Sequence, residues 1–295
     1  MHTYARTSIP MTTLVTGARG SVARGVVTRL LAAGRDVRIA SSDPTALDPA
    51  PGVEAVRLSL AEPAADAAAA LRDVHSVFLY AEAAGIADFL AAARAAGVRH
   101  IVLLSSAAAA APDPAANPLA ASHHAVEVAV AESGLPYTVL RPGAFAGNTI
   151  GWKYRLLGAD SIQLPYPDAQ LAPIHEDDIA DVAAAVLLTG DRLGETLDLN
   201  GPESMSFADQ IAILSDVLGH ELPFVEVSRE EALADLTRHM NEGYANALLD
   251  LWQHSVDPEP VSGTTEAITG RPGRSFRAWA LDHREDFAGL AAPRG

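Results

Sequence analysis

The sequence predicts an α/β fold in which a doubly wound parallel sheet is joined to a smaller, mostly helical C-terminal substrate lobe. Short runs rich in β-branched residues alternate with alanine-rich stretches that carry apolar residues at helical spacing. Strands that alternate with helices of this length pair in parallel through right-handed crossovers. Glycines such as Gly34, Gly97 and Gly134 stand where the helices should end. Such sheets bind ligands at the carboxyl ends of their strands.

The expected elements follow one another along the whole chain. Apolar runs predict strands at residues 12–16, 37–40, 53–58, 77–81, 100–104, 137–141 and 196–200. Helical periodicity predicts helices at 22–31, 83–96, 119–133, 179–188, 207–218, 229–239, 244–254 and 276–287. Residues 255–274 are rich in Pro, Gly, Ser and Thr, which predicts a long loop.

Composition excludes several classes of function. The net charge of -16 repels phosphate backbones and anionic lipid, so we expect no direct nucleic-acid partner. The chain has no cysteine, which removes disulfides and thiolate nucleophiles and fits a cytoplasmic location. No apolar run reaches the roughly 18 to 20 residues of a membrane span. Residues 1–10 lack the pattern of a signal peptide and are expected to form a disordered leader.

A glycine-rich turn follows the first expected strand. Gly17 and Gly20 allow a sharp turn and a close approach to a pyrophosphate, and Ala23 permits close helix packing. Ser21 and Val22 open the next helix, whose N-terminal amides and dipole favour an anion. This order of strand, turn and helix predicts a Rossmann-type site for a nicotinamide dinucleotide.

The second expected strand bears on the choice of cofactor. An acid at its end would bind the adenosine ribose and disfavour a 2′-phosphate, but the strand ends at Ser41-Ser42 and no acid comes before Asp43. Arg19 could reach a 2′-phosphate, and Ser42 could bind it by a hydrogen bond. We therefore expect NADP(H) to be preferred over NAD(H). The alternative is that Arg19 is only solvated.

These features divide the chain into two expected domains. The dinucleotide-binding Rossmann domain should span residues 11–150, and a C-terminal substrate region should span 151–295. Part of 171–200 should return to the sheet.

Several stretches together resemble one family. They read VTGARG at 15–20, AAGVRHIVLLSS at 95–106, LPYTVLRPGAF at 135–145, HEDDIA at 175–180 and LNGPE at 199–203. On these residues the chain resembles the NmrA-like atypical short-chain dehydrogenases/reductases over residues 11–287. The family includes NAD(P)H-dependent quinone reductases, relatives of isoflavone reductases, and dinucleotide-binding redox sensors.

The resemblance implies which residues contact the cofactor. Two departures from the family weaken the expected adenosine contacts. Many relatives carry Gly-Asp-Leu where this chain reads LSL at 58–60, and many carry a basic residue at the position of Ser42. The implied contacts are Gly17, Arg19, Gly20, Leu60, Tyr80, Ala81, Ser105, Pro142, Gly143 and Phe145.

The usual catalytic pair of the family is missing. Short-chain dehydrogenases protonate their substrate through Tyr-x-x-x-Lys, but Lys153 is the only lysine and Thr149 precedes it by four. By the resemblance, Leu119 aligns with the tyrosine and His123 with the lysine. Glu127 lies one helical turn after His123 and could orient it and raise its pKa. Alternatively, His123 only binds a ribose hydroxyl or lines the wall.

The expected substrate wall follows the strand at 137–141. It comprises Asn148, Trp152, Tyr154 and His175, whose aromatic members could also simply pack between the lobes. The acids at 176–178 open a helix, where they act as caps and dipole partners, so no metal site is assigned.

The sequence therefore predicts an NAD(P)H-dependent oxidoreductase that reduces a quinone-like, polycyclic or otherwise conjugated small molecule. One alternative is an NADP(H)-binding redox sensor that acts on a protein partner without turnover. Another is a non-redox cyclase or isomerase. The sequence leaves a homo-oligomer open.

Overall fold

The computed structural model describes residues 11–158 and 161–287, and it confirms the predicted fold class. The expected leader at 1–10 lies outside the described residues. Seven strands form one sheet in the order β3-β2-β1-β4-β5-β6-β9. These strands are β1 (Thr12–Val15), β2 (Val37–Ser41), β3 (Glu54–Arg57), β4 (Val74–Tyr80), β5 (His100–Leu104), β6 (Tyr137–Pro142) and β9 (Thr196–Leu199).

The strand order reverses between β1 and β4. β1 pairs in parallel with β2 on one side and with β4 on the other, so the chain runs outward in both directions from this point. The carboxyl ends of β1 and β4 therefore flank the crevice in which doubly wound sheets bind their ligands.

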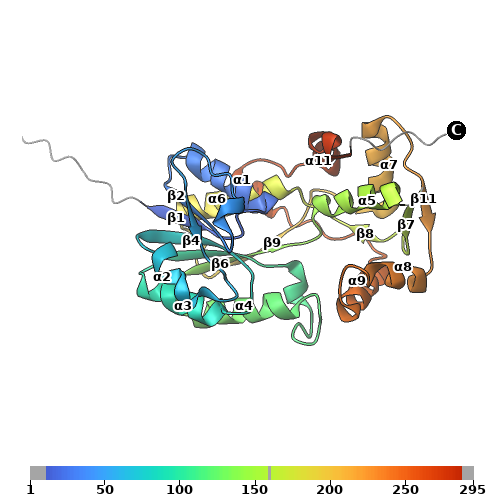
Figure 1. Cartoon of the computed structure of the whole chain (residues 1–295). Helices are drawn as coiled ribbons and strands as arrows, with labels where there is room; N and C mark the ends of the chain where they lie inside the picture. Colours follow the sequence, from blue (N-terminus) through green and yellow to red (C-terminus); the bar gives the residue numbers. More distant parts are fainter. Residues whose placement is uncertain (1–10, 159–160, 288–295) are drawn as a thin grey trace, which may run out of the picture. The chain divides into compact units, whose positions relative to one another are not determined.

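Helices cover both faces of this sheet. Figure 1 shows α1 (Ser21–Ala32) and α6 (Glu176–Thr189) on one face, where Arg29 of α1 pairs with Asp181 of α6 at 2.5 Å. The other face carries α2 (Ala67–Ala70), α3 (Ile86–Ala95) and α4 (Ala121–Glu132). β5 is buried along its whole length, as expected for a central parallel strand covered on both faces.

The chain divides into two compact units that are both discontinuous in sequence. Unit 1 consists of Met1–Ser105, Ala125–Leu140 and Ala180–Thr196, and it contains most of the sheet. Unit 2 consists of Ser106–His124, Arg141–Ile179 and Leu197–Gly295. The division into a dinucleotide-binding domain and a substrate region near residue 150 remains a proposal.

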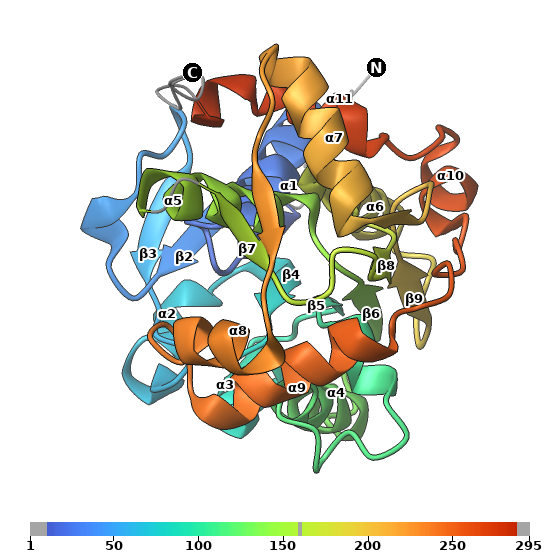
Figure 2. The ribbon, with the colours of Figure 1, turned by 90° about the vertical axis from the view of Figure 1, so that its right-hand side faces the viewer.

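Unit 2 is built mainly from helices and very short strands. Figure 2 shows α8 and α9 side by side, and β11 beside β7, with which it pairs in parallel. The helices are α5 (Ile150–Gly158), α7 (Phe207–Leu218), α8 (Arg229–Leu236), α9 (Glu242–His254), α10 (Thr264–Thr269) and α11 (Phe276–Asp282). The strands are β7 (Ile162–Leu164), β8 (Gln170–Leu171), β10 (Met205–Ser206) and β11 (Phe224–Glu226).

Several elements differ from the sequence prediction. α10 lies inside the predicted loop at 255–274, bounded by Gly263 and Gly270 with φ of 66° and 71°. Its six residues are too few to show a helical period. α4 begins two residues later than predicted, because Asn117 accepts a hydrogen bond from the amide of Leu119 and forms a separate turn there. The strands β7, β8, β10 and β11 were not predicted, because two or three residues are too few to show an alternation of apolar and polar side chains.

No helix in the described part of the chain is both long enough and apolar enough to cross a bilayer.

Candidate functional site

The glycine turn after β1 is held against β4 in unit 1. The hydroxyl of Thr16 donates to the carbonyl of Phe78 at 3.1 Å and accepts from the amide of Tyr80 at 2.8 Å. Gly17 adopts φ of +64°, a conformation that favours glycine. A Cβ at Gly17 would lie 3.1 Å from the Cβ of Tyr80. Glycine at this position therefore serves both the turn and the close packing against β4.

The N-terminus of α1 fits a pyrophosphate. Gly20 is the N-cap residue and supplies no side chain to the helix amides, and no acid stands in the first turn. Ser21 is exposed, whereas the side chain of Val22 is buried in the core, so Val22 could contribute only its backbone amide. The uncapped amides and the helix dipole leave this end suited to an anion.

The end of β2 presents serines and an acid that is already engaged. Asp43 caps the short helix Pro44–Ala46, because its carboxylate accepts from the hydroxyl of Thr45 at 2.6 Å and from its amide at 3.1 Å. These hydrogen bonds from Thr45 lower the pKa of Asp43, and the charge of Arg19 adds to the effect. Arg19 and Ser42 are exposed.

The predicted adenine and ribose contacts lie at the ends of neighbouring strands. Tyr80 at the end of β4 is half-exposed, and Leu60 is partly buried against the core. Gly85 was not singled out from the sequence, yet a Cβ there would lie 2.6 Å from the carbonyl oxygen of Leu60. Its φ of +72° shows that only glycine is readily accommodated where the chain passes Leu60.

Ser105 at the end of β5 bonds to a buried carboxylate. Its hydroxyl donates to Oε1 of Glu127 on α4 at 2.5 Å, and both residues are at least nine-tenths buried. The sequence analysis predicts that Ser105 contacts the cofactor and that Glu127 orients His123. The structure shows in addition that these two side chains bond to each other.

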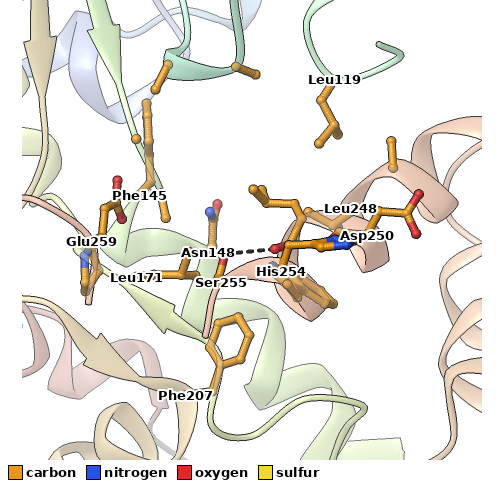
Figure 3. A pocket seen from close by; sticks show the side chains of 18 of the residues that line it. Leu119, Phe145, Asn148, Leu171, Phe207, Leu248, Asp250, His254, Ser255 and Glu259 are labelled. Carbon is orange, nitrogen blue, oxygen red and sulfur yellow. Dashed lines mark hydrogen bonds between the residues drawn. The ribbon is translucent and has the colours of Figure 1, made fainter. Parts of the chain in front are cut away.

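Unit 2 contains a cavity of about 1410 Å³. Pro142 at the end of β6 lines it together with Gly143 and Phe145 from the following loop, and Asn148 and Trp152 follow from the next helical turns. Figure 3 shows Phe145 and Asn148 on one side of the cavity and Leu119 and Leu248 on the other.

Both positions of the missing catalytic pair line this cavity. Leu119, at the tyrosine position, and His123, at the lysine position, are among its lining residues. The only lysine, Lys153, instead donates a hydrogen bond to the carbonyl oxygen of Asp286. The cavity wall therefore carries an apolar side chain and an imidazole at the two positions that the family resemblance aligns with the usual proton donor and its lysine.

Two of the predicted substrate residues do not line this cavity. Tyr154 is 69% exposed and is absent from the lining. His175 is buried, with Nδ1 accepting from the amide of Asp177 at 3.1 Å and Nε2 lying 3.4 Å from Oδ2 of Asp282. The neighbouring acids open α6 as predicted, and Asp178 pairs with Arg274.

The cavity also contains polar residues that the sequence did not single out. Glu259 accepts a hydrogen bond from the amide of Ala172 at 2.7 Å, and its Oε1 lies 3.3 Å from where a Cβ at Gly143 would stand. Gln210 is 2% exposed, and its Nε2 has no hydrogen-bond partner among the described residues. Both lie in apolar or irregular sequence, where no spacing distinguishes a cavity residue from a core residue.

Comparison with known proteins identifies the family. The chain matches the family described as NAD(P)H-binding over residues 17–189. It is 38% identical to a (4-alkanoyl-5-oxo-2,5-dihydrofuran-3-yl)methyl phosphate reductase of Streptomyces griseus, over 93% of this chain and 99% of that protein.

Two solved structures share the fold. One is the NADPH complex of an NADPH-dependent quinone oxidoreductase from Escherichia coli, with a TM-score of 0.76, 23% identity, and coverage of 92% of this chain and 99% of that one. The other is the negative transcriptional regulator NmrA in complex with NADP, with a TM-score of 0.73, 19% identity, and coverage of 93% and 95%. The chain therefore belongs to the NAD(P)H-binding family and is an NAD(P)H-dependent oxidoreductase, and it shares its fold with NmrA.

Proposed function

We propose that the protein reduces a conjugated, electron-poor small molecule, such as a quinone or an unsaturated lactone, and that NADP(H) is its preferred cofactor. The observation that carries this proposal is the presence of Leu119 and His123 in the cavity wall, because the family resemblance aligns them with the tyrosine and lysine. An isolated ketone becomes a localised alkoxide on reduction and depends on the missing acid. A conjugated acceptor depends less on that acid, because the charge that follows hydride addition is delocalised.

The chemistry of a conjugated acceptor suits these residues. Bound NAD(P)H supplies a hydride, and the acceptor gains two electrons that spread onto a carbonyl oxygen. One proton completes the reduction, and His123 or a water molecule could deliver it. Phe145 and Trp152 supply aromatic side chains to the cavity that holds this flat molecule.

The named relatives support this class of substrate. The 5-oxo-2,5-dihydrofuran ring in the name of the Streptomyces griseus enzyme's substrate holds a carbon–carbon double bond conjugated to a lactone carbonyl. A quinone, the acceptor of the Escherichia coli enzyme, is likewise a conjugated carbonyl compound. In both molecules the charge that follows hydride addition is delocalised.

The residues around the adenosine end support NADP(H). The carboxylate of Asp43 is engaged with Thr45, so it is poorly placed to bind ribose hydroxyls. Arg19 and Ser42 are exposed near the end of β2 and could bind a 2′-phosphate.

The test is NADPH consumption with a panel of acceptors and the purified protein. We expect turnover with 1,4-naphthoquinone or an acyl-substituted unsaturated lactone, and none above background with cyclohexanone. Reduction of cyclohexanone at a comparable kcat/KM would contradict the proposal. Tight NADP(H) binding without turnover of any acceptor would favour the redox sensor instead.

A further inference from the structure

The cavity of unit 2 is larger than one ring-shaped substrate requires. Its volume of about 1410 Å³ exceeds the roughly 300–1,000 Å³ of an ordinary small-molecule site. The lining continues from Leu119 and Phe145 to α8 and α9, far along the sequence. The nicotinamide would take the part of this volume beside Pro142, Gly143 and Phe145. A substrate that also reaches α8 and α9 must therefore extend beyond the reacting ring.

α9 has two apolar faces, and one of them packs against α8. Ala245 and Leu249 are fully buried against Ala232 and Leu236 of α8. Tyr244, Leu248 and Leu251 recur at i, i+4 and i+7, so they share a different face of the helix. This second face lines the cavity.

The second face leaves large apolar side chains uncovered. Tyr244 is 39% exposed and Leu251 is 46% exposed. Together with neighbours from α8 and the connection to α9, this face forms what we call the apolar wall. Its members are Leu236, Met240, Tyr244, Ala247, Leu248 and Leu251. An uncovered apolar surface that is continuous with a ligand cavity indicates contact with an apolar group.

Two pairs of oppositely charged residues lie near this wall. Arg155 lies 2.8 Å from Asp235, and Asp250 lies 2.7 Å from Arg229. Because each of these charges is balanced by its partner, and the six members of the wall are uncharged, the wall itself offers no charge to an ionic group. Met240 adds an adaptable side chain that tolerates a flexible ligand.

We propose that the substrate carries an unbranched alkyl chain, which lies along the apolar wall while the conjugated ring occupies the cavity between Phe145 and Leu119. The wall from Tyr244 to Leu251 is about 10 Å long, the length of an extended chain of about eight carbons. This assignment rests on the proposed function, because it extends the substrate of the same site.

The test uses 2-alkyl-1,4-benzoquinones with methyl, butyl and octyl chains. Calorimetry on the full chain saturated with NADP⁺ measures their binding without turnover. Each methylene buried on the wall should lower Kd by up to about fourfold. Turnover of the methyl compound with NADPH is measured separately, and it tests the proposed function alone.

Two variants test where the alkyl chain of the substrate lies. Leu251→Asn should weaken binding of the octyl compound by about tenfold more than binding of the methyl compound. Leu281→Asn is the matched control, since Leu281 is a helix residue that is 56% exposed outside the cavity lining, and it should leave the dependence on chain length unchanged. Thermal unfolding confirms that both variants fold.

The outcomes separate the two proposals. Equal Kd values for the methyl and octyl compounds would overturn the alkyl-chain assignment, even if the methyl compound is reduced. The same would follow if Leu251→Asn and Leu281→Asn behave alike. A strong dependence on chain length without reduction of any quinone would support the wall and contradict the proposed function.

Discussion

The hydroxyl of Ser105 donates to Oε1 of Glu127 at 2.5 Å, and this bond joins the end of β5 to α4 within unit 1. A carboxylate that accepts so short a bond holds the serine proton firmly. Ser105 is therefore a poor source of a proton for a substrate. Among the polar side chains of the predicted site, His123 is then the strongest candidate for that task.

Replacement of His123 separates its two predicted roles. If its imidazole delivers the proton, His123→Ala should lower kcat about 100-fold or more and change substrate binding little. If it only holds the ribose, the same variant should weaken cofactor binding and preserve kcat at saturating cofactor. His123→Gln is the control, because an amide can donate a hydrogen bond but cannot deliver a proton near neutral pH. A fully active His123→Gln variant would rule out His123 as the proton donor.

Gly17→Ala should abolish measurable dinucleotide binding. The added Cβ would lie 3.1 Å from Tyr80 in a turn with φ of +64°, so the loop that faces the pyrophosphate must shift. Gly34→Ala is a matched control, since Gly34 has φ of +74° and no atom within 4 Å of the added Cβ. It should cost a similar backbone strain of about 1–2 kcal/mol without loss of binding. Equal cofactor affinities of the two variants, measured by calorimetry, would contradict the assignment.

Arg19→Ala should weaken NADP(H) binding by about tenfold or more and leave NAD(H) binding nearly unchanged. The reason is the loss of a charge-assisted bond to the 2′-phosphate. Arg72→Ala removes the same charge from an exposed turn of unit 1 and controls for long-range electrostatics. A preference for NAD(H) in the unaltered protein would refute this prediction.

His100 should make the fold sensitive to mild acid. Burial lowers its pKa and the charge of His75 lowers it further, against an opposing effect of Asp191. The folded protein thus favours the neutral form of His100, whose Nε2 is bonded to Thr138 at 2.9 Å. Below pH of about 6.5 the unfolded chain takes up a proton that the folded chain resists. The free energy of unfolding, measured in urea, should therefore fall as the pH drops below about 6.5.

His100→Gln provides the comparison, because its amide can still donate to Thr138 and does not titrate. Its free energy of unfolding should fall less steeply over the same pH range. An identical slope for the two proteins would show that His100 is not responsible.

The sheet and the glycine turn could be predicted from the sequence because their signals are local. Gly17 and Gly20 stand between an apolar strand and an amphipathic helix, so strand, turn and helix identify one another. The alternation of strands and helices then predicts the parallel sheet.

The cavity of unit 2 could not be predicted in the same way. The spacing of the apolar residues in α9 predicts a helix but not which of its faces is buried. Only the tertiary contacts show that Leu249 belongs to the core whereas Leu251 lines a cavity. Glu259 lies in a stretch read as a loop, and its carboxylate reaches Ala172 across 87 residues. His175 looked available from its place before α6, yet Asp177 and Asp282 engage both of its nitrogens.

The path of the hydride tests the central claim most directly. The protein is supplied with NADPH deuterated at the transferred position of C4 and with an acyl-substituted unsaturated lactone, and the product is analysed by NMR. Hydride addition to a conjugated system predicts one deuterium on the carbon β to the carbonyl groups, with an ordinary solvent-derived hydrogen on the α carbon. Deuterium on a carbinol carbon would instead show direct addition of hydride to the acyl carbonyl, and would contradict a site that works without the tyrosine–lysine pair.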